Sequence, residues 1–166
     1  METAARVRLA LIATGVTLAA CTPASAPPPR ESDLLIGAWR SQVRASSGAL
    51  TEMKDLEFMY VFNAGGTMME SSNYDGAPPV PPAYGVWRKT AAREFEAKYA
   101  FYTTKPPSAF EDLVKGGGWN PSGYGILTEK ITVAADGKSY GSKLQYKLFD
   151  ANGKEVDGGG EATGVG

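Results

Sequence analysis

The residues of this sequence that could do chemistry are mostly carboxylates and tyrosines. Its 166 residues include no histidine and a single cysteine. A Ser-His-Asp triad, a Cys-His dyad and any histidine-containing metal site are therefore excluded by composition, and we assign no metal and no cofactor. Several carboxylates fall in strand-like segments: Glu57, Glu70, Glu94, Glu96 and Glu129. Their spacing identifies no acid–base pair, so we name no catalytic residue.

A set of large apolar side chains is better placed for binding than for catalysis. By strand alternation they face one side of the chain, and they are Phe58, Tyr60, Phe62, Trp87, Tyr99, Phe101, Leu144 and Tyr146. Such a wall would suit an apolar or aromatic ligand, with tyrosine hydroxyls supplying a few polar contacts. The alternative is that the same side chains simply fill the interior of the fold.

The same alternation sorts the carboxylates. Glu57, Glu94 and Glu96 fall opposite the aromatic face, so we expect them to be solvated. Glu70 and Glu129 are not assigned to either face. A carboxylate deep in a cavity with a raised pKa would favour an enzyme.

The elements that must position these residues are strands. Apolar alternation between turn signals predicts eight of them, at 34–44, 55–62, 67–74, 84–90, 93–103, 123–135, 139–149 and 154–165. Glycine-containing turns at 63–66, 136–137 and 150–153 connect successive strands. Sequential strands with short turns predict an all-β fold, an eight-stranded antiparallel up-and-down barrel, because closure removes exposed sheet edges.

Four features interrupt this strand pattern. Residues 105–118 predict a short helical insertion, with an apolar periodicity at Phe110, Leu113 and Val114. Trp119 follows it, either plugging one end of the barrel or contacting a partner. The proline-rich segment 75–83 is expected to be a rigid connection, or else a recognition segment. Glycines 158–160 interrupt the last strand, where they could accommodate a bulge or a close backbone approach.

The N-terminal 20 residues have the pattern of an export signal. Arg6 and Arg8 precede an apolar run, 7–20, that is too short to span a bilayer, which needs about 20 apolar residues. The run ends in Leu18-Ala19-Ala20-Cys21, which resembles the lipobox of bacterial lipoproteins. The resemblance implies cleavage before Cys21 and acylation of its sulfur and new amine. Two or more acyl chains anchor a protein stably.

The chain therefore divides into three parts: a lipoprotein signal peptide at 1–20, a lipidated proline-rich tether at 21–33 and a barrel at 34–166. The expected location is the cell envelope. Thr22 after the lipidated cysteine implies the outer membrane facing the periplasm, if the source is Gram-negative. The membrane is the expected partner, through the lipid on Cys21.

The barrel segment also resembles a known group of proteins. Gly37-Ala38-Trp39 opens the first strand, Phe62-Asn63-Ala64-Gly65-Gly66-Thr67 spans a turn, Gly85-Val86-Trp87 lies on the fourth strand, and Phe149-Asp150-x-x-Gly153 comes late. This order resembles lipocalin-like barrels of the calycin type found in bacteria, most of unassigned function, and more weakly the allene oxide cyclase type of barrel. In lipocalins the first tryptophan packs against a late basic residue, and here no basic residue follows Lys154.

These observations predict a membrane-anchored lipoprotein whose barrel binds a small apolar or aromatic ligand. One alternative is a structural or interaction protein of the cell envelope with a filled barrel. Another is a barrel enzyme of the cyclase or isomerase type. A net charge of −1 without a basic patch gives no reason to expect a nucleic-acid partner, and no protein partner is indicated.

Overall fold

The computed structural model describes residues 34–75, 80–109, 111–112 and 118–166. The predicted signal peptide, Cys21 and the tether lie outside the described residues. So do Pro78 and Pro79 of the proline-rich segment, and Phe110, Leu113 and Val114, on which the predicted helical insertion rests. Among the described residues, no helix is long and apolar enough to cross a membrane.

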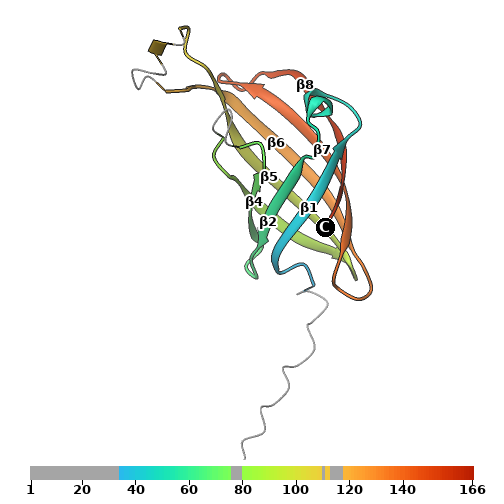
Figure 1. Ribbon diagram of the computed structural model, residues 1–166. Helices are drawn as coiled ribbons and strands as arrows, with labels where there is room; N and C mark the ends of the chain where they lie inside the picture. The colour runs from blue at the N-terminus through green and yellow to red at the C-terminus, as the bar shows by residue number, and fades with distance from the viewer. Residues whose placement is uncertain (1–33, 76–79, 110, 113–117) are drawn as a thin grey trace, which may run out of the picture.

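Eight antiparallel strands form a closed barrel in which each strand pairs with its neighbours in sequence (Figure 1). They are β1 (Gly37–Ala45), β2 (Glu57–Phe62), β3 (Thr67–Ser72), β4 (Ala83–Ala91), β5 (Glu94–Lys105), β6 (Asn120–Val133), β7 (Tyr140–Asp150) and β8 (Glu155–Val165). The pairing of β1 with β8, with Val43 opposite Gly164, closes the cylinder. The predicted fold class is confirmed.

Period-two alternation is what makes these segments barrel strands. Along β2, Phe58, Tyr60 and Phe62 are buried, whereas Met59 and Val61 between them are exposed. Apolar residues on one face of each strand can leave water only if the sheet curls around them. Closure also pairs the backbone groups that an open sheet would leave at its edges.

One end of the barrel is closed by packed aromatic side chains. Trp39 meets Tyr140 edge to face at 5.2 Å between ring centroids, and its indole Nε1 donates to the carbonyl of Leu35 at 2.9 Å. Trp87 similarly donates to the carbonyl of Asn63 at 3.0 Å. The β2–β3, β4–β5 and β6–β7 connections lie at this closed end. Because the aromatic rings pack there, little free space is left.

The opposite end carries the β1–β2, β3–β4, β5–β6 and β7–β8 connections, and we call it the open end. A short 3-10 turn, η2 (Ala49–Glu52), lies there, although no helical turn was predicted in this segment. Glycines of β8 let the β1–β2 connection come close, since a Cβ on Gly160 would clash with the Ser47 carbonyl. The β7–β8 register also shifts between Tyr146 and Leu148. Of the two predicted alternatives, a bulge or a close backbone approach, the close approach is confirmed, and the register shift lies at the same place.

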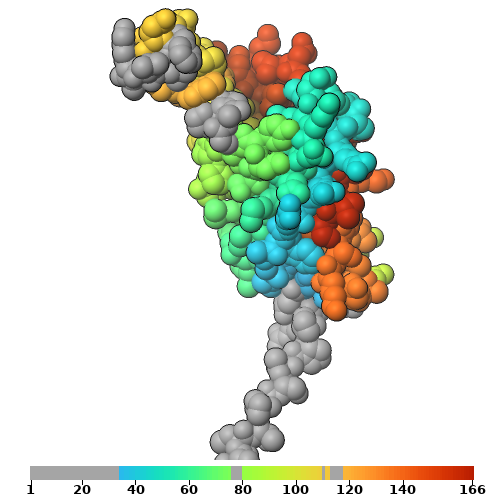
Figure 2. Space-filling view, in the orientation of Figure 1, coloured from blue at the N-terminus to red at the C-terminus, as the bar shows by residue number. Residues whose placement is uncertain are grey.

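The outer face of β2, β3 and β4, which we call the outer wall, carries large apolar side chains, as the interior of the barrel does. Its exposed large residues are Met59, Val61, Met69, Tyr84 and Val86, and the strand register places Val61 beside Met69 and Met69 beside Tyr84. The packed surface of this side of the barrel is seen in Figure 2. The outer residues of these strands form one continuous patch.

Candidate functional site

A pocket of about 180 Å³ opens at the open end of the barrel. Its wall is drawn from most of the strands and from the loops above them: Ala49, Leu50, Met53, Leu56, Phe58, Glu70, Ser72, Tyr74, Asp75, Val80, Pro81, Ala83, Phe101, Leu127, Tyr146 and Leu148. Most of these side chains are apolar. A small, concave, apolar site with few polar groups is the usual form of a site for a small molecule.

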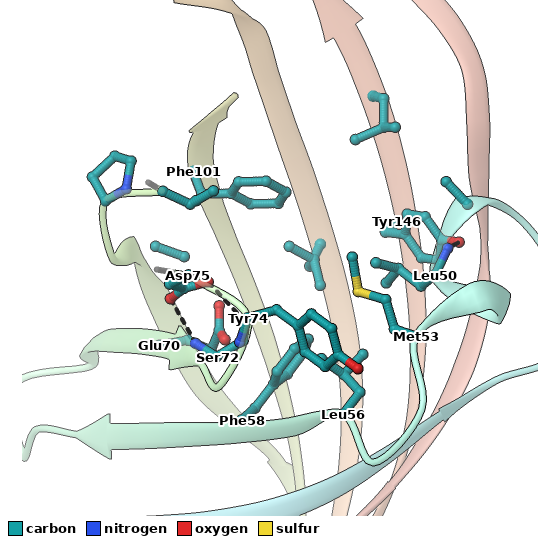
Figure 3. Close-up of a pocket in the computed structure, with 16 residues that line it drawn as sticks. Leu50, Met53, Leu56, Phe58, Glu70, Ser72, Tyr74, Asp75, Phe101 and Tyr146 are labelled. Atoms are coloured by element: carbon teal, nitrogen blue, oxygen red, sulfur yellow. Dashed lines mark hydrogen bonds between the residues drawn. The ribbon is translucent and has the colours of Figure 1, made fainter. Parts of the chain in front are cut away.

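The polar groups of this pocket are unevenly distributed. Figure 3 shows Glu70, Ser72 and Asp75 together on one side, with Leu50, Met53 and Tyr146 on the other. Among the residues that the structure describes, two carboxylates line the pocket, and no lysine or arginine does. The pocket is therefore apolar with one acidic side.

Glu70 points into the barrel because every second side chain of its strand, β3, faces inward. It stands between Tyr60 of β2 and Ala83 of β4 in the strand register, and the small Ala83 leaves room for a long side chain. Glu70 is 6% exposed, and its Oε1 has no hydrogen-bond partner among the described residues. Burial, then the charges of Asp75 and Glu129, raise its pKa to about 8.

Asp75 is held differently from Glu70. Its Oδ2 accepts the backbone N–H of Ser72 at 2.6 Å, and its Oδ1 accepts the Ser72 hydroxyl at 2.8 Å. Both oxygens thus have donors, and the carboxylate is fixed at the end of β3. Of the two carboxylates, Glu70 is the one with unused hydrogen-bonding capacity.

Tyr146 fixes the η2 turn over the pocket. Its hydroxyl donates to the Ser47 carbonyl at 2.9 Å and accepts the backbone N–H of Leu50 at 3.1 Å. Gly48 makes this approach possible, because a Cβ there would overlap the Tyr146 hydroxyl. One side chain from β7 therefore positions the cover of the site.

A second cluster of polar side chains, formed by Tyr60, Tyr99 and Glu129, lies deeper in the barrel. The hydroxyls of Tyr60 and Tyr99 are 3.2 Å apart, and Tyr99 donates to Glu129 Oε2 at 3.0 Å. Burial raises the pKa of Glu129, and the hydroxyls of Ser142, Tyr99 and Tyr60 offset part of the rise. Burial also raises the pKa values of both tyrosines. Both tyrosines are therefore held in their neutral forms.

Within the described part of the chain, several polar atoms around Glu129 have no hydrogen-bond partner: Ser41 Oγ, Glu129 Oε1, Tyr140 Oη and Ser142 Oγ. Gly164 of β8 gives the two serines their space, since a Cβ there would lie 2.5 Å from Ser142 Oγ and 3.0 Å from Ser41 Oγ. Unpaired buried polar groups cost free energy, so this lower interior is less stable than a fully apolar core would be.

The predicted ligand-binding residues divide into two groups. Phe58, Phe101 and Tyr146 line the pocket. The other five, Tyr60, Phe62, Trp87, Tyr99 and Leu144, are buried in the packed core below it. The lower barrel is thus filled and the open end is hollow, while ligand binding by this aromatic wall stays a prediction.

The predictions for the carboxylates can also be compared with the structure. Glu57, Glu94 and Glu96 lie on the outer face, where Glu57 pairs with Arg40 and Glu96 with Arg88. The prediction that these three are solvated is confirmed. Glu70 and Glu129, which were not assigned to a face, point inward. The inward phase of Met68, Glu70 and Ser72 along β3 was a signal that could have placed Glu70.

Two further features bear on the predicted function. Trp119 is half-buried and belongs to neither the described core nor the pocket wall. Asp75 and the η2 turn lie in loops, where strand alternation gave no prediction.

The described residues contain no group of three or more side chains that could hold a metal ion.

Comparison of the chain with protein-family models, with curated proteins and with solved structures finds no match. Arguments about function therefore rest on the site itself.

Proposed function

We propose that this chain is a lipid-anchored protein whose barrel binds a small, mostly apolar molecule in the pocket at its open end. The observation that carries the proposal is an apolar cavity into which one buried carboxyl group, that of Glu70, projects, with no partner for Oε1 in the part of the chain that the structure describes. A buried polar atom left unpaired costs about 1–3 kcal/mol. A ligand that supplies the missing contact recovers that cost.

The size of the pocket limits the ligand. Pockets for drug-sized molecules usually measure about 300–1,000 Å³. A cavity of about 180 Å³ is smaller than this range, so it suits a short alkyl or single-ring compound. The apolar lining supplies binding free energy at about 25 cal/mol per Å² buried.

Native mass spectrometry of the full chain isolated from its own source tests this proposal. We expect a small molecule to co-purify with the chain. Leu148→Trp, which fills the pocket from β7, should carry much less of it, whereas Val165→Trp on the outer face should carry the same amount. Equal occupancy of both variants would overturn the assignment of the ligand to this pocket.

The anchor is a separate part of the proposal. It rests on Leu18-Ala19-Ala20-Cys21, the lipobox-like sequence. The described chain starts at Leu34, which lies 3.5 Å from the Cβ position of Gly137 at the closed end. Mass spectrometry of the N-terminal peptide should find acylated Cys21, and an unmodified Cys21 in membrane-extracted protein would contradict the anchor.

A second candidate function is acid–base catalysis on the bound molecule. It is favoured by the pKa of Glu70, about 8, because a general acid or base works best near the ambient pH. Exchange of the α-hydrogens of 2-hexanone in D₂O is a direct assay. Catalysis predicts exchange that Glu70→Gln abolishes, and equal rates with and without the protein would exclude proton transfer to this ketone.

A further inference from the structure

The acidic side of the pocket restricts the chemistry of the ligand, an inference that rests on the proposed binding function. The carboxyl groups of Glu70 and Asp75 line the cavity on the same side (Figure 3). No lysine or arginine among the described wall residues balances them. An anionic ligand such as a fatty acid would bring a negative charge beside Asp75 in an apolar site, which is unfavourable.

We propose that the pocket binds a small amphipathic amine, with its ammonium group beside Glu70 and Asp75 and its apolar body against Phe58, Phe101 and Leu127. An ammonium group offers three N–H donors. Glu70 Oε1 is a buried acceptor for which the described residues supply no donor, whereas the Asp75 oxygens already accept from Ser72. The ligand would thus supply both the missing donor and the missing positive charge.

The walls of the pocket also suit this orientation. Aromatic side chains of β2, β5 and the β3–β4 connection, namely Phe58, Phe101 and Tyr74, line the cavity. Aromatic faces attract cations as well as apolar groups. Gly125 lets Phe101 lie close against β6, since a Cβ there would be 2.5 Å from its ring. The apolar part of the ligand therefore has a preformed aromatic surface beside the carboxylates.

Binding of an amine must displace a proton from Glu70 below pH 8. The titratable groups that face Glu70 are Asp75 from the β3–β4 connection, Tyr60 from β2, Tyr99 from β5 and Glu129 from β6. The other two titratable side chains that line the pocket are those of Tyr74 and Tyr146. Asp75 and Glu129 raise the pKa of Glu70, and a cation reverses that effect by favouring the ionised form.

Isothermal titration calorimetry with three six-carbon probes separates this inference from the proposed function. The full chain carrying Cys21→Ser, which cannot be acylated at the sulfur of residue 21, is titrated at pH 7.5 with hexylamine, 1-hexanol and hexanoate. We expect hexylamine to bind at least tenfold more tightly than 1-hexanol, and hexanoate not to bind. Glu70→Gln should reduce hexylamine affinity at least tenfold, while Glu94→Gln on the outer face should change neither the hexylamine nor the 1-hexanol affinity.

The pH dependence provides a second measurement that needs no pocket variant. Hexylamine affinity should rise about tenfold from pH 6 to pH 7 and become constant above pH 8, with proton release at the lower pH. The affinity for 1-hexanol should not rise. If 1-hexanol binds as tightly as hexylamine, or hexylamine affinity is constant from pH 6 to 8, the amine assignment is wrong and the apolar site stands. If none of the probes binds, the proposed function fails as well.

Discussion

The Tyr99 hydroxyl donates to Glu129 Oε2 at 3.0 Å inside the barrel, where both residues are almost completely buried. The register explains how a glutamate fits there: Glu129 of β6 stands opposite Ala97 of β5 and Leu144 of β7. Glu70 likewise stands opposite Ala83. In both cases a neighbouring alanine makes room for a carboxyl group that a packed core would exclude.

Replacing Tyr99 by Phe tests this pair. Glu129 Oε2 would lose its donor, and an unsatisfied buried polar atom costs about 1–3 kcal/mol. We expect Tyr99→Phe to lower the free energy of unfolding in urea by that amount. Tyr102→Phe, three residues along β5 and 72% exposed, is the control and should change it by less than 0.5 kcal/mol, which is about the limit for surface substitutions. Equal effects of the two substitutions would show that the buried contact contributes nothing.

Glu70 should make the stability of the barrel depend on pH. Its pKa is raised from 4.5 to about 8 in the folded protein, so unfolding above pH 4.5 releases a proton. Stability is therefore fully present below pH 4.5 and is lost as the pH rises towards 8, by about 1.4 kcal/mol per pH unit.

Glu70→Gln removes this loss, because the amide does not ionise. Its stability relative to the unsubstituted protein should increase from pH 5 to pH 8, measured by urea unfolding at each pH. Glu94→Gln, on the exposed outer face, should show no such trend. A Glu70→Gln difference that stays constant across this range would mean that the carboxyl group is solvated in the folded protein.

Tyr146→Phe should release the η2 turn from the pocket. The substitution removes the hydrogen bonds to Ser47 and Leu50 and leaves the apolar packing in place. We expect faster amide hydrogen exchange at Leu50 and a loss of about 1 kcal/mol of stability. Tyr84→Phe on the outer wall is the matched control. Unchanged exchange at Leu50 would show that other contacts hold the turn.

Gly85 should tolerate no side chain. A Cβ there would clash with the Lys98 carbonyl and lie 2.5 Å from Tyr99 Cβ, both on the adjacent strand β5. We expect Gly85→Ala to cost at least 2 kcal/mol, in the range of overpacking, about 1–3 kcal/mol. Gly141 has open space around its Cβ position, so Gly141→Ala should leave thermal stability equal or slightly higher. Similar melting temperatures for both variants would contradict the close approach of β4 and β5.

The strands could be predicted from the sequence because alternation is a local property. β2 and β5 begin and end within two residues of the predicted bounds. The glycines at 158–160 were also informative, because missing side chains permit a close backbone approach that the sequence can signal.

The site was harder to predict because it depends on several distant segments. Phe58 and Phe101 were correctly predicted to face inward, but alternation cannot tell which inward residues border free space. That depends on the height of each residue along the barrel, and hence on the register between strands. Asp75 and the η2 turn come from loops whose positions are set by contacts such as that of Tyr146 with Ser47.

Methyl NMR of the methionines tests the central claim, that the open end holds a binding site, most directly. Met53 lines the pocket, whereas Met59 and Met69 lie on the outer wall. On titration of the full chain carrying Cys21→Ser with 1-hexanol, we predict a saturable shift of the Met53 methyl signal, no shift of Met59 or Met69, and no saturable shift in Leu148→Trp. A Met53 signal that does not move, or a saturable shift only at Met59 and Met69, would contradict the account.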